Sequence, residues 1–237
     1  MPSATVEDYV KAIYLAQEAA ASPPPTSTPT PRRRGRAAPG AVPLGQLALA
    51  MNVVPGTATA MVKALSEAGL VKYQSRRGVR LTPGGEKLAL HVLRRHRLIE
   101  LFLVRVLHLD WSEVHDEAEA LEHVVSEKVL SRLDHLLGYP QTDPHGDPIP
   151  STTGKLPPAP ARGRPLSIVP DGETVQLLRV DNRDPEFLRF ARAAGLLPGT
   201  TLTLTSRTPA ASTLTLKLNK KPLTLSESAA QKLHVSL

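Results

Sequence analysis

Ionisable side chains suited to metal binding cluster between residues 115 and 123. Glu119, Glu122 and His123 are spaced i, i+3 and i+4, so a helix would present them on one face, and His115 lies one turn earlier on the same face. Carboxylate and imidazole groups gathered in this way can coordinate a divalent cation between two helices. The alternative is a solvated charged face, which is what most Glu-x-x-His strings form.

A second pair, His96 and Glu100, has the i, i+4 spacing that places both on one helix face, which they share with Leu93 and Leu103. Ionisable groups in such a partly buried position need a partner, and locally a single His–Glu hydrogen bond would be enough. Two such stripes on consecutive helices, together with Asp8 on the first predicted helix, favour a metal site. Because neither a nucleophile nor a Gly-rich phosphate-binding loop accompanies them, the pattern indicates metal sensing rather than hydrolysis.

The composition limits both the site and its partners. The 237 residues include no cysteine, which excludes disulfides, zinc ribbons, iron–sulfur clusters and thiol nucleophiles, so a metal must be held by His, Asp and Glu. Lys and Arg total 29 against 22 for Asp and Glu, and the formal charge of +7 favours a polyanionic partner. No apolar run approaches the roughly 18 residues that a membrane span requires. These features predict a cytoplasmic protein without a membrane partner.

The N-terminal part of the chain begins with a predicted amphipathic helix over residues 5–21. Residues 22–43 follow, rich in Pro, Ser, Thr and Ala, and their composition predicts a disordered basic insertion. Its arginines, Arg32, Arg33, Arg34 and Arg36, are close enough in sequence to a predicted DNA-binding unit to reach phosphates or an adjacent minor groove. A tolerated, solvated loop is an equally good explanation.

The next segment has the pattern of a helix–turn–helix followed by a hairpin. A short helix from Leu44, a turn over residues 52–54, a helix opened by Pro55 and two strands with a basic tip within residues 70–81 fit a winged helix. The second helix would present small and polar residues to base edges in the major groove, and the hairpin would contact phosphates. The residues expected to contact DNA are Thr57, Thr59, Ala60, Lys63, Arg76, Arg77 and Arg80. A plain helical hairpin with a solvated turn is the alternative.

Beyond residue 81 the apolar period stays helical and then changes. Thr82 is placed to cap a long helix that continues to about residue 107, and further helices are predicted over 112–126 and 126–137. Residues 141–165 are dense in Pro and Gly, which predicts an interdomain linker. Strands over 174–180, 200–205, 213–218 and 221–225, with a short helix over 185–194, predict a small β-barrel. The fold class is therefore mainly α with a small β-barrel.

The order and spacing of short strings along nearly the whole chain resemble the diphtheria toxin repressor family of metal-dependent transcriptional regulators. The strings are Glu7-Asp8-Tyr9, Glu67-Ala68-Gly69-Leu70-Val71, Leu81-Thr82-Pro83-Gly84-Gly85, Arg95-His96-Arg97-Leu98-Ile99-Glu100, Val114-His115-Asp116-Glu117-Ala118, Glu122-His123-Val124 and His145-Gly146-Asp147-Pro148-Ile149-Pro150. The resemblance implies a winged helix–turn–helix DNA-binding domain (1–81), a central helical metal-binding and dimerisation domain (82–140), a linker (141–165) and a C-terminal SH3-like domain (166–237). It also implies a homodimer that binds palindromic double-stranded operator DNA and is not an enzyme.

The resemblance places the primary metal site on Asp8, Glu119, Glu122 and His123. In the iron-responsive branch of the family the first two of these positions hold Met and Cys, whereas here both are carboxylates, as in the manganese-responsive branch. Hard oxygen ligands suit Mn²⁺, so we expect a manganese-responsive protein, with Fe²⁺ as the alternative because oxygen and nitrogen ligands accept both ions. Lys11 stands where the two-domain manganese regulators carry an acid, which argues against their closely spaced pair of ions.

The resemblance also places an ancillary site on His96, Glu100 and His115, as in the longer iron-type members. That site takes further ligands from the SH3-like domain, for which Asp184 and Glu186 are the candidates.

An ion that joins Asp8 to the helical core would hold the two DNA-reading units of a dimer at one spacing, roughly 34 Å or a multiple of it. By the resemblance, the regulated genes are metal-transport genes that are repressed when metal is plentiful. A metal-dependent hydrolase would use the same His and Glu residues, but the sequence has no evident oxyanion donor or nucleophile. The other rival is an adaptor whose barrel binds protein partners and whose helix–turn–helix is only a dimer surface.

Overall fold

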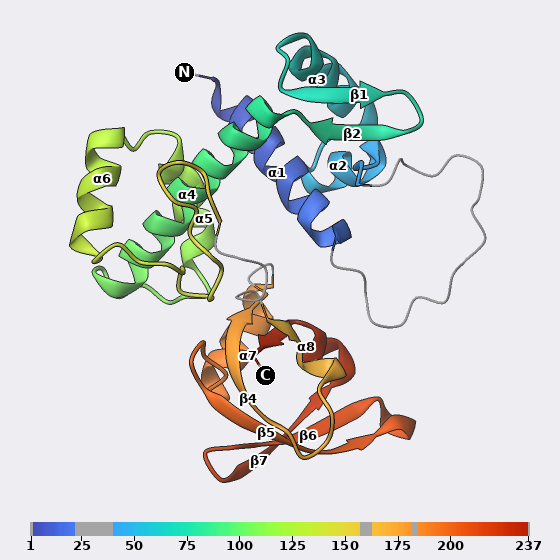
Figure 1. Ribbon diagram of the computed structural model, residues 1–237, viewed down its shortest axis with the longest axis vertical. Helices are drawn as coiled ribbons and strands as arrows, with labels where there is room; N and C mark the ends of the chain where they lie inside the picture. The colour runs from blue at the N-terminus through green and yellow to red at the C-terminus, as the bar shows by residue number, and fades with distance from the viewer. Residues whose placement is uncertain (1, 22–39, 157–162, 182–183, 237) are drawn as a thin grey trace. The chain divides into compact units, whose positions relative to one another are not determined.

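The computed structural model describes residues 2–21, 40–156, 163–181 and 184–236, and the chain divides into two compact units, residues 1–93 and 94–237 (Figure 1). The arginines of the predicted basic insertion, Arg32, Arg33, Arg34 and Arg36, lie outside the described residues. Over the described ranges no single helix is long and apolar enough to cross a membrane, and one bent pair, Leu44–Ala50 with Pro55–Glu67, passes that test only when taken together.

The first unit is a helix–turn–helix followed by a β-hairpin wing, as predicted (Figure 1). Its elements are α1 (Ala4–Ala21), α2 (Leu44–Ala50), α3 (Pro55–Glu67), β1 (Val71–Gln74), β2 (Gly78–Leu81) and the first turns of α4 (Pro83–Arg105). Apolar residues at helical spacing form the core, with Ile13 of α1 and Val62 of α3 fully buried. The chain turns between α2 and α3 at Asn52, whose φ of 51° is a left-handed conformation that Asn tolerates.

Local sequence determines where the wing meets its neighbours. The Thr82 hydroxyl accepts a hydrogen bond from the Gly85 amide at 3.1 Å and so caps α4, as predicted. A Cβ at Gly85 would lie 2.0 Å from the Leu70 carbonyl oxygen, so only glycine lets α4 begin this close to the chain before β1. Val42 lies within the segment 22–43 that was predicted to be disordered, yet it is buried and pairs with Val79 of β2, so the end of that segment is held against the wing.

The helical part of the second unit packs α5 (Val114–Glu122) and α6 (Glu127–Leu136) with the second half of α4. One buried cluster joins α4 to α5: Ile99, Leu103, Val114 and Ala118. Both later helices are shorter than predicted. Helix α5 ends at Glu122, so His123 is its C-cap residue, and Ser126 caps α6 by accepting a hydrogen bond from a backbone amide one turn on.

The C-terminal part of the second unit is a curved antiparallel sheet with its strands in the order β3-β8-β4-β5-β6-β7 (Figure 1). The elements are β3 (Arg164–Pro165), β4 (Thr174–Val180), α7 (Pro185–Ala193), β5 (Thr201–Thr208), β6 (Thr213–Leu218), β7 (Lys221–Ser226), α8 (Glu227–Gln231) and β8 (Leu233–Val235). Alternate leucines of β5 and β6 fill its core, as in the predicted barrel. Strands β3 and β8 and helix α8 are missing from the prediction because elements this short show no period.

Residues 141–150, at the start of the predicted interdomain linker 141–165, are packed against their neighbours. Asp143, His145 and Ile149 are buried, and Ile149 packs with core residues of α4 and α6. Gly146 has a φ of 89°, and a Cβ there would lie 1.9 Å from the Leu178 carbonyl oxygen. The Pro and Gly residues that suggested a linker therefore shape a tight turn inside the packed second unit.

His234 on β8 makes the stability of the SH3-like domain depend on pH. Its Nε2 lies 2.7 Å from Nη2 of Arg179 on β4. Burial, and then the charge of Arg179, lower the pKa of His234 to about 4, although Asp147 and Asp181 oppose the shift. The unfolded chain takes up this proton near pH 6.5, so acidification below that value favours unfolding until the native histidine is also protonated near pH 4.

We therefore expect the domain to lose up to about 2 kcal/mol of stability between pH 7 and pH 5 through this histidine alone. The chain has one tryptophan, and Trp111 packs in the core of the domain, so its fluorescence reports unfolding. Urea titrations should show a smaller pH dependence for His234→Gln than for the wild type. Identical pH profiles for the two proteins would contradict the assignment.

Candidate metal centre

The predicted metal ligands of the second unit lie together where α5 packs on α4. Helix α4 carries His96 and Glu100, which are almost completely buried. Helix α5 and its C-cap carry the others, His115, Glu119, Glu122 and His123. The apolar face of α5 packs against α4, and the polar side chains beside that face are therefore turned toward His96. Because they share one face of one helix, their spacing in the sequence was enough to identify them.

His96 stands at the centre of this group. Its Nδ1 lies 2.7 Å from Oε2 of Glu122, and its Nε2 lies 3.0 Å from Oε1 of Glu100. The same Nε2 lies 3.1 Å from Nδ1 of His115, and the two rings meet edge to face. His96 thus joins a residue predicted for the primary site to two that are predicted for the ancillary site.

Three of the predicted primary ligands form a compact donor set. Glu119, Glu122 and His123 each offer one ligand atom, and these atoms lie within 4.8 Å of one another. Glu122 is fully buried, whereas the Glu119 side chain is 37% exposed, so the set opens toward solvent on the Glu119 side. Two carboxylates and one imidazole are a donor set that fits a hard divalent cation. The fourth predicted ligand, Asp8, lies half-buried on α1 in the first unit, and its participation stays a prediction.

The predicted ancillary residues also lie near one another. Oε1 of Glu100 is 3.4 Å from Nδ1 of His115 in addition to its contact with His96. Asp184, one of the two candidate further ligands, caps α7, and its second oxygen accepts from Lys232 Nζ at 2.7 Å. Glu186 is exposed in the first turn of α7.

Opposing effects act on the ionisation of Glu100. Burial alone would raise the pKa of its carboxyl, but the charge of His96 and hydrogen bonds from His115 and His96 outweigh it. The pKa of Glu100 therefore lies well below its usual range. Glu100 is charged at neutral pH, as a metal ligand must be.

The structure brings together a second donor set that spacing along the sequence does not reveal. Glu100, Asp143 and His145 are all buried, and each places a ligand atom within 4.8 Å of the others. We call these three residues the buried triad. Oε2 of Glu100, Oδ2 of Asp143 and Nδ1 of His145 are buried without a hydrogen-bond partner. Because unsatisfied buried polar atoms are costly, a cluster of them points to a group that they would bind.

Hydrogen bonds fix the orientation of His145 and Asp143 in the buried triad. His145 Nε2 lies 2.8 Å from the Trp111 carbonyl oxygen, which makes Nε2 the donor and directs the lone pair of Nδ1 toward Glu100. Asp143 Oδ1 accepts hydrogen bonds from the amides of His145 and Asp147. Burial, and then the nearby Asp147 and Glu100, raise the pKa of Asp143 well above its usual value, so a cation bound here would compete with a proton for Asp143. The only sequence signal was the Asp-Pro-His-Gly-Asp string, which lay in the predicted linker.

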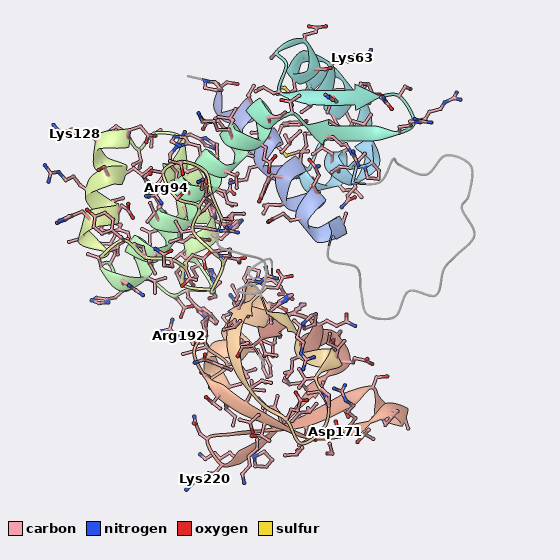
Figure 2. All side chains as sticks on the ribbon, in the orientation of Figure 1. Lys63, Arg94, Lys128, Asp171, Arg192 and Lys220 are labelled. Atoms are coloured by element: carbon pink, nitrogen blue, oxygen red, sulfur yellow. The ribbon has the colours of Figure 1, made fainter. Side chains whose placement is uncertain are left out.

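Buried arginines of α4, to which the sequence pattern assigns no role, hold the segments that carry these ligands. Arg94, labelled in Figure 2, donates to the Pro150 carbonyl and pairs with Asp134 of α6 at 2.6 Å. Arg95 donates to the Glu122 carbonyl at 2.9 Å, at the end of α5. Of three consecutive polar residues of α4, Arg94 thus contacts α6, Arg95 contacts the end of α5, and His96 lies in the metal centre itself.

The residues predicted to contact DNA lie on α3 and the wing of the first unit. Thr57, Ala60 and Lys63 are exposed on α3, and Figure 2 labels Lys63 there. The Thr59 hydroxyl donates to the Pro55 carbonyl at 2.8 Å, so part of its hydrogen-bonding capacity is used within the helix. The wing arginines, Arg76, Arg77 and Arg80, are all exposed.

Consecutive regions of the chain match three known families. Residues 39–79 match "Iron dependent repressor, N-terminal DNA binding domain", and residues 82–151 match "Iron dependent repressor, metal binding and dimerisation domain". Residues 164–237 match the "FeoA domain".

Individual proteins from both metal branches are similar to the chain. The iron-dependent repressor IdeR of Mycobacterium tuberculosis is 45% identical over 94 residues, which is 40% of this chain and 41% of that protein. The HTH-type transcriptional regulator MntR of Lysinibacillus sphaericus is 30% identical over 144 residues, 61% of this chain and 89% of that protein. The diphtheria toxin repressor of Corynebacterium efficiens is 34% identical over 170 residues, 68% and 74% of the two chains. The chain thus matches about two fifths of the mycobacterial protein's length.

Solved structures extend the similarity to nearly the whole chain. A structure described as a manganese-dependent transcriptional repressor in complex with manganese is 36% identical, with a TM-score of 0.82, and the match covers 98% of this chain and 100% of that one. The structure of the manganese regulator SloR is 29% identical, with a TM-score of 0.74, covering 98% and 97%.

Proposed function

This chain belongs to the diphtheria toxin repressor family of metal-dependent transcriptional regulators, and on that premise we propose that it is a dimeric, Mn²⁺-responsive DNA-binding repressor. The family consists of DNA-binding regulators and not of enzymes. The observation that carries the proposal is the donor set Glu119, Glu122 and His123, whose ligand atoms lie within 4.8 Å of one another. We place its action in the cytoplasm, with metal-transport genes as the regulated targets.

The donor chemistry supports manganese over iron. Glu119 and Asp8 are carboxylates at the two primary-site positions where the iron-responsive branch carries sulfur, and hard oxygen donors suit Mn²⁺. The similar structure that contains manganese adds support. Fe²⁺ is the competing ion because the affinity order for oxygen and nitrogen ligands favours it.

We propose that Asp8 links the ion to the DNA-reading unit. A bound divalent cation supplies positive charge that offsets the mutual repulsion of the carboxylates. Glu119, Glu122 and His123 would hold that charge on the helical domain, and Asp8 would bind it from α1. The four side chains together would favour one arrangement of reading unit and dimerisation domain, the one that meets both half-sites of a palindrome.

We propose that the buried triad holds a second ion. Two donor sets include Glu100: the predicted one, with His96 and His115, and the buried triad. The triad is favoured because its three ligand atoms are buried without hydrogen-bond partners, whereas His96 and His115 already lie within hydrogen-bond distance of their neighbours. Its carboxylates and imidazole again fit a hard divalent cation.

For DNA recognition we propose that α3 enters the major groove. Its exposed residues Thr57 and Ala60 would face base edges, while Lys63 and the wing arginines Arg76 and Arg77 would neutralise phosphates. The basic insertion would add phosphate contacts beside the wing, since Val42, near its C-terminal end, pairs with Val79 of β2.

The function is tested by following retardation of a palindromic operator while Mn²⁺, Fe²⁺ or Zn²⁺ is titrated. We expect Mn²⁺ to raise operator affinity by about tenfold or more, which requires a coupling free energy of only about 1.4 kcal/mol. A chelator should reverse the effect. Operator binding that stays the same with chelator would overturn the proposal, and a response to Fe²⁺ at lower concentration than Mn²⁺ would move the protein to the iron branch.

A further inference from the structure

One short loop carries two residues of the buried triad and also contacts the SH3-like domain. We call residues 143–147 the coupling loop; it supplies Asp143 and His145 to the triad. The His145 carbonyl accepts a hydrogen bond from the Val180 amide at the end of β4. Gly146 lies against the Leu178 carbonyl so closely that no Cβ fits between them. Any side chain at residue 146 would therefore have to displace either the coupling loop or β4.

Charge pairs connect the same parts. Asp147 lies between two arginines, 3.4 Å from Nη2 of Arg97 on α4 and 3.0 Å from Nη1 of Arg179 on β4. Arg97 also reaches Asp143, with Nε 3.6 Å from Oδ2, and donates to the Pro148 carbonyl. A continuous chain of ionic contacts therefore runs from Asp143 of the triad, through Arg97 and Asp147, to Arg179 of the SH3-like domain.

The aromatic contacts at the loop reinforce this connection. The His145 ring stacks on Trp111, with ring centroids 5.3 Å apart and planes 20° from parallel. Trp111 belongs to the hydrophobic core of the SH3-like domain, although it precedes α5 in the chain. Both the backbone and the ring of His145 are thus fixed by groups packed in that domain.

From these contacts we propose that Arg179 is a positioning residue for the ion at the buried triad, so that docking of the SH3-like domain and ion binding there stabilise each other. Arg179 holds Asp147, the Asp147 amide holds Asp143 Oδ1, and Asp143 faces Glu100 and His145. The coupling is reciprocal by thermodynamic necessity. If the contacts of Arg179 raise the affinity for the ion, the bound ion must stabilise those contacts equally, and β4 and β8 should then be better protected from hydrogen exchange. This inference rests on the second ion included in the proposed function.

The test measures Mn²⁺ binding to the full chain by electron paramagnetic resonance and protection of β4 and β8 by hydrogen exchange. Sites that bind Mn²⁺ with the same affinity form one class in this measurement, and the class that Asp143→Ala removes is the one at the buried triad. Arg179→Met should weaken that class by about tenfold or more, as loss of an outer partner does in other metal sites, and should abolish Mn²⁺-dependent protection of β8. Affinity of the class that depends on Glu119 should stay unchanged. Arg179→Lys, which keeps the charge, should restore most of the affinity.

Arg192→Met is the matched control. Arg192, labelled in Figure 2, pairs with Asp110 at 2.8 Å, so it also ties the SH3-like domain to the preceding segment, but through the residue before Trp111 and not through Asp147. It should leave both classes within about twofold of the wild type. The coupling would be overturned if Arg179→Met and Arg192→Met weakened Mn²⁺ binding at the buried triad equally. It would also be overturned if Asp143→Ala removed a class of sites and Arg179→Met did not weaken that class. If Asp143→Ala removes no class, the second ion and the coupling both fail, while the Glu119 site remains separately testable.

Discussion

Replacing Glu119 with alanine should abolish Mn²⁺-dependent operator binding. Glu119 contributes one of the ligand atoms of the compact donor set with Glu122 and His123. Loss of even an outer partner of a metal ligand costs 10- to 100-fold in affinity, so loss of a carboxylate ligand should cost on the order of 100-fold or more. The Glu119 side chain is 37% exposed, so the change leaves no buried cavity and the fold should persist.

The measurement is a Mn²⁺ titration of operator retardation, with the apparent Mn²⁺ affinity determined in parallel by isothermal calorimetry. Glu117→Ala is the matched control, because Glu117 is an exposed acid on the same helix outside the donor sets. It should bind Mn²⁺ and operator like the wild type. A Glu119→Ala protein that responds to Mn²⁺ as the wild type does would show that this donor set is not the regulatory site.

Replacing Asp8 with asparagine should separate ion binding from DNA binding. Glu119, Glu122 and His123 remain to hold Mn²⁺ on the helical domain, so binding should weaken without disappearing. The link to α1 is lost, however, and operator affinity should stop responding to Mn²⁺ even at saturation. Mn²⁺ is expected to raise the operator affinity of the wild type about tenfold or more, and it should leave that of Asp8→Asn unchanged.

Glu18→Gln provides the comparison, since it removes an acid from the same helix at a position outside the predicted site. It is expected to weaken the contact with Tyr14, whose hydroxyl donates to Glu18 at 2.9 Å. Saturating Mn²⁺ must be confirmed for each variant before operator affinities are compared. If Asp8→Asn keeps the full Mn²⁺ response, the ion acts through the helical domain alone, for instance through dimerisation.

Most of the fold follows from patterns that span only a few residues. A helical stripe, a cap such as Thr82 and a two-residue alternation each act within one turn or one strand, so the helices, the wing and the main strands were predictable. The same holds for Glu119, Glu122 and His123, because spacing along one helix determines that they share a face. Elements with too few residues for a period, such as β3 and β8, were missed.

The composition of the second donor set depends on contacts between distant parts of the chain. Glu100 is far from Asp143 and His145 in sequence, and no local period relates a helix to a Pro- and Gly-rich segment. The same residue types that suit a solvated linker also suit a buried turn, and only the packing of Gly146 against β4 and of Ile149 against the helices distinguishes the two. Spacing along a helix identifies candidate ligands, but packing between segments that are distant in sequence determines which of them lie close together.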